Sequence, residues 1–198
     1  MSKNYYNKAR FFTGAHEIRQ LPEDIGTEIA VAGRSNAGKS SVLNVITGNS
    51  KLARISKTPG RTQQMNIFVL DNERRLVDLP GYGYAKVPVA LRKHWGSTLN
   101  QYFQERRALS GLVLIMDIRH PLKPEDQRML DWSCQAGLPT HVLLNKSDKL
   151  SRGVGISLLQ QLKRRMNDDL ISIQLFSALK RTGVEEARTV LDGWFEYH

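Results

Sequence analysis

The chain has 198 residues, a formal net charge of +10, 40% apolar residues and 24% charged residues. This length favours one compact domain, and the apolar fraction is too high for a disordered chain. The only cysteine, Cys134, excludes an internal disulfide framework. The longest apolar run, 112–116, is far shorter than a bilayer span, and the first residues lack the apolar core of a signal peptide. We therefore expect a cytoplasmic protein with no membrane partner.

The positive charge is concentrated in one part of the sequence. Residues 29–70 contain no acidic residue, and their basic residues are Arg34, Lys39, Lys51, Arg54, Lys57 and Arg61. Such an excess is typical of proteins that bind a polyanion such as RNA. The alternative interpretation is a solvated surface that keeps the protein soluble.

Short apolar runs alternate with longer amphipathic stretches along the chain. The expected elements, in chain order, are a strand at 28–33, a helix at 39–47, strands at 66–70 and 75–78, a helix at 89–107, a strand at 111–117, a helix at 124–134, a strand at 140–145, a helix at 155–167, a strand at 171–176 and a helix at 183–197. This alternation predicts an α/β three-layer sandwich, with a mixed, mostly parallel six-stranded sheet and helices on both faces. The short connection 71–74 predicts that the second and third strands form an antiparallel hairpin.

The chain is expected to divide near residue 24. We predict that residues 25–198 form the domain and that 1–24 form an N-terminal extension, which packs on the domain and is partly disordered. Within the extension, Phe11, Phe12, Ile18 and Leu21 are candidates to pack an edge strand, which is not among the six strands. Residues 51–64 show no apolar periodicity and are expected to form a mobile loop. Ligands of such sheets bind beyond the carboxyl ends of the strands, and the motifs below fall there.

A phosphate-binding motif follows the first predicted strand. Residues 33–40 read GRSNAGKS and match G-x-x-x-x-G-K-[ST] at the start of a predicted helix. Glycines let the backbone N–H groups curl around a phosphate, and the helix N-terminus adds positive potential. Lys39 is expected to reach the β- and γ-phosphates, and the Ser40 hydroxyl to bind Mg²⁺. The alternative is a glycine-rich turn that caps a helix. By itself the motif indicates an NTPase or a kinase without naming the base.

A second motif, at the end of a later strand, indicates guanine. Residues 145–148 read NKSD. The Asp148 carboxylate can accept hydrogen bonds from the ring N–H and the amino group of guanine, a donor pair that adenine lacks. Asn145 is expected to brace the loop and the base edge, and the Lys146 stem to cover the ring face. The alternative is a strand that ends in polar residues by chance.

Three weaker signals complete the set. In DLPG, Asp78 is expected to hold Mg²⁺ through water and the Gly81 N–H to meet the γ-phosphate, although a simple Pro-Gly turn is the alternative. Thr58 and Thr62 both lie in the expected loop 51–64, the basic loop, and either one is a candidate for a further Mg²⁺ ligand. After the last strand, a backbone N–H in 177–179 can bond the guanine oxygen.

These five elements, in this order, resemble the TRAFAC class of P-loop GTPases. The segments GRSNAGKSS, SKTPGRTQ, DLPGYGYA, MDIRHPLK and NKSDKL are similar to the EngB (YihA/YsxC) family of bacterial ribosome-biogenesis GTPases. The resemblance covers nearly the whole chain. It implies a Ras-like fold, GTP and GDP as ligands, Mg²⁺, and a switch role in assembly of the large ribosomal subunit, with a need in normal cell division and septation. The implied partner is a large-subunit precursor of rRNA and ribosomal proteins, bound by a monomer.

The resemblance also assigns site residues. It implies catalytic roles for Lys39, Thr62 and Gly81, and makes Thr62 the switch threonine that binds the metal together with Ser40. The implied nucleotide contacts are Gly33, Arg34, Ser35, Asn36, Ala37, Gly38, Lys39, Ser40, Gly60, Arg61, Thr62, Gln63, Gln64, Asp78, Leu79, Pro80, Gly81, Asn145, Lys146, Ser147, Asp148, Ser177, Ala178 and Leu179.

Two positions bear on the rate of hydrolysis. Where Ras has a water-positioning glutamine this chain has Tyr82, which predicts slow intrinsic hydrolysis. Asn36 stands where potassium-activated GTPases carry a metal-coordinating asparagine, which makes K⁺ a candidate cofactor; simple loop geometry is the alternative. A module that binds GTP and recruits division proteins without binding ribosomes is the alternative function.

Overall fold

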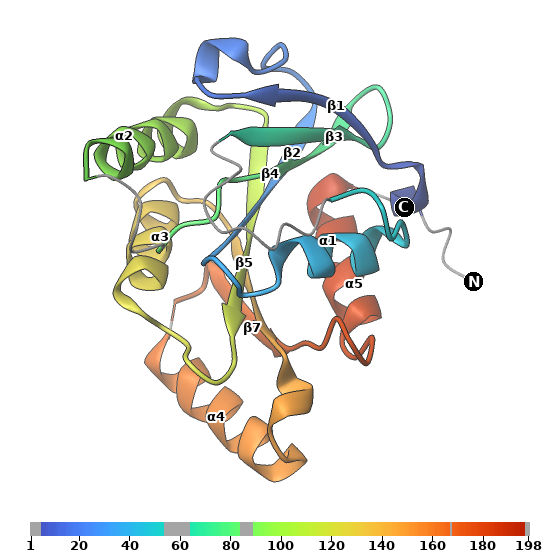
Figure 1. Ribbon diagram of the computed structural model, residues 1–198, viewed down its shortest axis with the longest axis vertical. Coiled ribbons are helices and arrows are strands. Elements are labelled where there is room, and N and C mark those ends of the chain that lie inside the picture. The colour runs from blue at the N-terminus through green and yellow to red at the C-terminus, as the bar shows by residue number, and fades with distance from the viewer. Residues whose placement is uncertain (1–4, 54–63, 84–88, 167, 197–198) are drawn as a thin grey trace.

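The computed structural model describes residues 5–53, 64–83, 89–166 and 168–196, without the side chains of 89–94. The predictions for Thr58, Gly60, Arg61, Thr62 and Gln63, and most of the expected 51–64 loop, lie outside these residues. Three layers are visible in Figure 1, with a twisted central sheet between two groups of helices. The α/β sandwich expected from the sequence is therefore confirmed.

The sheet has seven strands in the order β1-β3-β4-β2-β5-β6-β7. Their bounds are β1 Arg10–Ala15, β2 Thr27–Gly33, β3 Met65–Val69, β4 Arg74–Asp78, β5 Leu109–Asp117, β6 Thr140–Asn145 and β7 Ile171–Leu175. Strands β2, β4, β5, β6 and β7 are parallel, and β3 and β4 form the predicted antiparallel hairpin.

The prediction of six strands is wrong by one strand, β1. This strand pairs antiparallel with β3 at the edge of the sheet, and its register shifts between Phe11 and Thr13. Phe11 and Phe12 are both 57% exposed, and the strand shows no alternation of apolar and polar residues. The sequence pattern of a half-buried strand is therefore missing.

The helices form two layers, one on each face of the sheet. Their bounds are α1 Lys39–Thr47, α2 Val89–Glu105, α3 Pro124–Gln135, α4 Arg152–Arg165 and α5 Val184–Phe195. Buried side chains of α1 and α5 pack with Ile29 and Val113 on one face, whereas α2, α3 and α4 pack with Ala30 and Leu114 on the other. Consecutive side chains of each central strand thus pack into the cores on opposite faces of the sheet, as the alternation of strand side chains requires.

The segment before β1 lies on the α1 and α5 side of the sheet. Tyr6, in the 3-10 turn Tyr5–Lys8, is only 1% exposed. Its hydroxyl donates to Asp192 Oδ1 of α5 at 2.5 Å, and its ring lies 6.3 Å from that of Phe195. The division of the chain at residue 24 stays a prediction. None of the helices in the described ranges has the length and apolar character needed to cross a membrane.

A buried cluster of charges joins several elements at the amino ends of the central strands. Glu28 of β2 is fully buried and accepts hydrogen bonds from Arg106 Nη2 at 2.6 Å, Arg106 Nε at 3.0 Å and the Tyr102 hydroxyl at 3.2 Å. Arg75 of β4 lies 3.3 Å from the same carboxylate and also donates to the carbonyls of Glu23 and Ile25. One carboxylate thus connects β2, β4, and the end of α2.

We predict that Glu28→Gln destabilises the protein. A glutamine keeps the shape but removes the charge that compensates two buried guanidinium groups, and breaking a buried pair in this way costs about 3 kcal/mol. Chemical denaturation measures the loss. The control is Glu73→Gln, whose side chain is 76% exposed and whose closest ionic contact is 3.9 Å. Equal stabilities of the two variants would contradict the structural role given to Glu28.

Candidate functional site

The predicted motifs converge at the carboxyl edge of the sheet. Gly33, Asp78 and Asn145 are the last residues of β2, β4 and β6. Ser177 follows β7 after a single residue. Four chain segments that are far apart in sequence therefore meet at one edge, as expected for a mostly parallel sheet.

The loop between β2 and α1 needs glycine at two positions. Gly38, which precedes the first residue of α1, has a φ of +97°, and a Cβ there would lie 2.4 Å from the Asn145 side-chain nitrogen. A Cβ on Gly33 would lie 2.9 Å from the Ile115 carbonyl oxygen. The motif glycines thus allow the loop to bend tightly and to approach the neighbouring strands.

Asn145 ties this loop to the segment after β7. Its side-chain Nδ2 donates to the Ala37 carbonyl at 2.8 Å, and its Oδ1 accepts from the Ala178 N–H at 3.2 Å. The residue is only 2% exposed. Asn145 therefore connects the two segments through backbone contacts, and its expected role at the base edge stays a prediction.

Asp148 lies against the same segment. The Ser177 hydroxyl donates to Asp148 Oδ1 at 2.5 Å and accepts from the Lys180 N–H at 3.1 Å. Lys149 Nζ is 3.8 Å from Asp148 Oδ2. The Ser147 N–H donates to the Phe176 carbonyl at 3.0 Å. These contacts fix the direction of the Asp148 carboxylate, which is 10% exposed.

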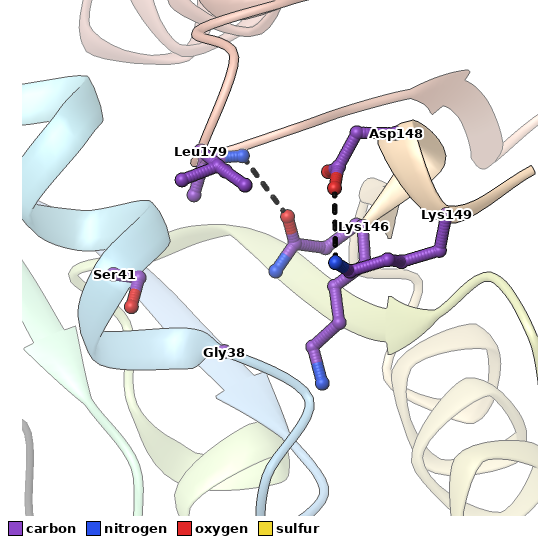
Figure 2. A pocket seen from close by; sticks show the side chains of 8 residues that line it. Gly38, Ser41, Lys146, Asp148, Lys149 and Leu179 are labelled. Carbon is purple, nitrogen blue, oxygen red and sulfur yellow. Dashed lines mark hydrogen bonds and ion pairs between the residues drawn. The ribbon is translucent and has the colours of Figure 1, made fainter.

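A pocket of about 390 Å³ opens between these segments. Figure 2 shows the Lys146 side chain extending away from Asp148 along the pocket, with α1 on the opposite side. The lining residues are Gly38, Ser41, Asn145, Lys146, Asp148, Lys149, Ala178 and Leu179. The sequence analysis did not predict Ser41 and Lys149 as site residues. Each directly follows a predicted motif, and this position next to a motif is what could have indicated them.

Next to this pocket, the loop between β2 and α1 lies against the end of β4. Lys39 Nζ forms an ion pair with Asp78, and both side chains are mostly buried, at 13% and 8% exposure. Ser40 is the second residue of α1. The Ser35 N–H donates to the Tyr82 carbonyl at 2.8 Å. This part of the site therefore holds a lysine, a carboxylate and a hydroxyl near the N-terminus of a helix.

The DLPG segment divides into buried and exposed residues. Leu79 and Pro80 are buried, and the Leu79 N–H donates to the Val31 carbonyl at 2.9 Å. Leu79 belongs to the core, so its side chain positions the segment from within the protein. Gly81 is exposed. Gln64, at the opposite end of the hairpin from the turn, donates to Asn66 at 3.0 Å and lies beside Gly14 of β1.

Tyr82 is held by α3. Its hydroxyl donates at 2.9 Å to Asp126, which is 1% exposed and also accepts from the Lys123 N–H at 3.1 Å. Burial, followed by the charge of Asp126, raises the pKa of Tyr82 well above its ordinary value. The hydroxyl therefore stays protonated as a donor. The Arg34 side chain lies nearby, within 3.3 Å of the position a Cβ would take on Gly83.

Comparison with known proteins identifies relatives of this chain. Residues 28–146 match the family described as 50S ribosome-binding GTPase. The probable GTP-binding protein EngB of Stenotrophomonas maltophilia (strain K279a) is 55% identical over 190 residues, which cover 94% of this chain and 95% of that protein. The EngB protein of Xanthomonas campestris pv. campestris (strain 8004) is 53% identical over 94% of this chain and 92% of its own.

Solved structures show the same fold. A crystal structure of a probable GTP-binding protein engB has a TM-score of 0.71 at 21% identity, covering 87% of this chain and all of that one. Aquifex aeolicus Era bound to GDP.AlF4⁻ has a TM-score of 0.66 at 23% identity, covering 84% of this chain and 56% of that one. These likenesses place the chain among P-loop GTPase folds, and the curated relatives are far closer in sequence. The chain therefore belongs to the EngB family of GTP-binding proteins and is a GTPase that binds guanine nucleotide.

Proposed function

We propose that this GTPase is a nucleotide-dependent switch in assembly of the large ribosomal subunit. The observation that carries the proposal is the match of residues 28–146 to 50S ribosome-binding GTPases, together with a preformed pocket at the motif segments. In this proposal the protein docks as a monomer on cytoplasmic large-subunit precursors when it holds GTP and leaves after hydrolysis. Normal cell division and septation then depend on it through ribosome supply.

The pocket lined by Asp148 is the proposed base site. The Asp148 carboxylate is close to Ser177, and Lys146 and Leu179 border the space where a planar ring fits. The backbone after Ser177 is the proposed donor to the guanine oxygen. Asn145 holds the two sides of this pocket together through its contacts with Ala37 and Ala178.

The β2–α1 loop is the proposed phosphate site. Its N–H groups lie at the N-terminus of α1, where the helix dipole favours negative charge. Lys39 is the proposed partner of the β- and γ-phosphates, and the exposed Gly81 N–H is the proposed partner of the γ-phosphate. The nucleotide contacts proposed for 60–64 rest on the sequence alone. Gln64, which the structure describes, donates to Asn66.

The same end of the site fits Mg²⁺. This ion prefers oxygen ligands and keeps several of its waters. Ser40 offers a hydroxyl at the start of α1, and the Lys39–Asp78 ion pair brings the Asp78 carboxylate to the same loop. Ser40 and Thr62 are the proposed protein ligands, with Asp78 acting through water. When bound, Mg²⁺ neutralises charge on the β- and γ-phosphates.

Tyr82 supports slow intrinsic hydrolysis. Its hydroxyl is engaged with Asp126 of α3, and a phenol in that contact does not orient an attacking water as an amide does. An activating group or ion must then supply this function. K⁺ is proposed as that ion, with Asn36 as its candidate ligand in the phosphate loop.

Sedimentation of cell lysate in GTP, in GDP and in a non-hydrolysable GTP analogue tests the switch. We expect the protein to travel with large-subunit particles in GTP and in the analogue, and to leave them in GDP. Because each phosphate contact of RNA releases counterions, this binding should weaken steeply with salt. Arg54→Ala/Lys57→Ala, in the basic loop outside the described residues, should reduce the salt dependence. Co-fractionation with division proteins and never with ribosomal particles would favour the scaffold function instead.

We predict that Asp148→Asn exchanges guanine preference for xanthine preference. Xanthine presents a carbonyl where guanine presents its amino group, so the amide of an asparagine can donate to it. Losing a charge-assisted pair of bonds to guanine costs about 2 to 4 kcal/mol. Competition between GTP and XTP measures the change. A variant that still selects GTP as the wild type does would show that Asp148 does not read the base.

We predict that Lys39→Ala weakens GTP binding and also destabilises the nucleotide-free protein. The substitution leaves the Asp78 carboxylate, which is 8% exposed, without its cation, at a cost of about 1 to 3 kcal/mol. The double variant Lys39→Ala/Asp78→Asn removes this charge and should recover most of the stability but none of the GTP affinity. Thermal unfolding and GTP titration give the two readouts. Wild-type GTP affinity in both variants would refute the proposed phosphate site.

A further inference from the structure

A second carboxylate lies behind the base pocket. Asp117 is the last residue of β5 and pairs with Asn145 of β6 in the sheet register. Its Oδ2 accepts from Lys146 Nζ at 2.8 Å and from Arg119 Nη2 at 2.7 Å, and its Oδ1 accepts from Arg119 Nε at 2.9 Å. The carboxylate is 14% exposed. It therefore joins a lysine of the pocket to an arginine outside it.

Lys146 is fixed at both ends of its side chain. Its backbone is left-handed, with a φ of +65°, at the turn that follows β6. Its ammonium donates to Asp117 at 2.8 Å and to the Asn36 carbonyl of the phosphate loop at 2.6 Å. The stem between these ends borders the pocket (Figure 2). The position of this pocket wall thus depends on what holds the ammonium.

Asp117 is the charged partner in this arrangement. Burial acts to raise the pKa of Asp117, but hydrogen bonds from Arg119 and Lys146 outweigh burial and keep it well below its ordinary value. The carboxylate is therefore ionised whenever the protein is folded at neutral pH. The carbonyl of Asn36, the other partner, carries no charge. An ion pair is the stronger of the two restraints on a lysine with four rotatable bonds.

We propose that Asp117 is a positioning residue for guanine recognition, whose carboxylate holds the Lys146 stem as a wall of the base pocket before nucleotide binds. The inference rests on the proposed role of residues 145–148 in binding the base. A wall that is already ordered does not lose side-chain entropy when the ring packs on it. Since the effect acts on the base and not on the γ-phosphate, it should be equal for GDP and GTP.

Asp117→Asn is the test variant. An asparagine keeps one oxygen for the Arg119 N–H, which donates to Asp117 Oδ1 at 3.1 Å, but it loses the charge and the second acceptor. We expect affinity for GDP and GTP to fall by about tenfold each, mainly through faster release. KM for GTP should rise with the dissociation constant, and kcat should fall far less. The control is Asp131→Asn on α3, which makes the same charge change at an exposed residue.

A double-mutant cycle separates this inference from the proposed base site. Lys146→Ala should weaken binding as Asp117→Asn does, and the double variant should be within about twofold of Lys146→Ala alone, because the two act as a unit. Losses that multiply, or a wild-type affinity for Asp117→Asn beside a weakened Lys146→Ala, would overturn the inference. Wild-type affinity for Lys146→Ala would instead refute the proposed role of Lys146.

Thermal unfolding without nucleotide separates a positioning defect from a folding defect. An unfolding temperature of Asp117→Asn close to that of Asp131→Asn, beside the weakened nucleotide binding, supports the positioning role. A loss of affinity that appears only together with a large fall in unfolding temperature would overturn it.

Discussion

The site depends on one buried amide, that of Asn145. It is the last residue of β6, and it contacts the phosphate loop with its nitrogen and the segment after β7 with its oxygen. The contact with the phosphate loop needs glycine at position 38, since a Cβ there would lie 2.4 Å from the amide nitrogen. The sheet brings the three segments to one edge, but the amide sets their spacing. The positions of the proposed phosphate site and base site therefore both depend on the Asn145 side chain.

Two lysines of the site are each paired with a carboxylate, and the pairs serve opposite purposes in this account. Lys39 pairs with Asp78 in the region proposed for the phosphates, so a bound nucleotide competes for that lysine. Lys146 pairs with Asp117 behind the pocket, where the pair leaves the opening free. The first pair compensates charge in the nucleotide-free protein. The second is proposed to shape the pocket and to persist when nucleotide fills it.

The sequence predicted the elements well because their signals are local. The helix at 39–47 and the strand at 140–145 have the expected bounds, since a glycine-rich turn and an apolar run mark their ends. The edge strand β1 lacks such a local signal, because its side chains are largely exposed and show no alternation. A strand of this kind is defined by its partner β3, and pairing partners are not visible in local patterns.

Contacts within the site were harder to predict than its members. The bond from Tyr82 to Asp126 spans 44 positions, and the ion pair between Lys146 and Asp117 spans 29. Motif spacing says nothing about such partners, because they depend on how α3 and β5 pack against the motif segments. Ser147 and Gln64 lie in recognised motifs, but the motifs did not predict their partners either. The Ser147 N–H donates to the Phe176 carbonyl, and Gln64 donates to Asn66.

A crystal structure of the protein with GDP tests the central claim, that the pocket between Lys146 and Leu179 is a preformed guanine site. We expect the base to enter this pocket with both donors of its edge within hydrogen-bond distance of Asp148. We also expect the Asn145 contacts with Ala37 and Ala178, and the Lys146 contact with Asp117, to remain as they are here. A base bound elsewhere, or a pocket that forms only after these contacts break, would contradict it.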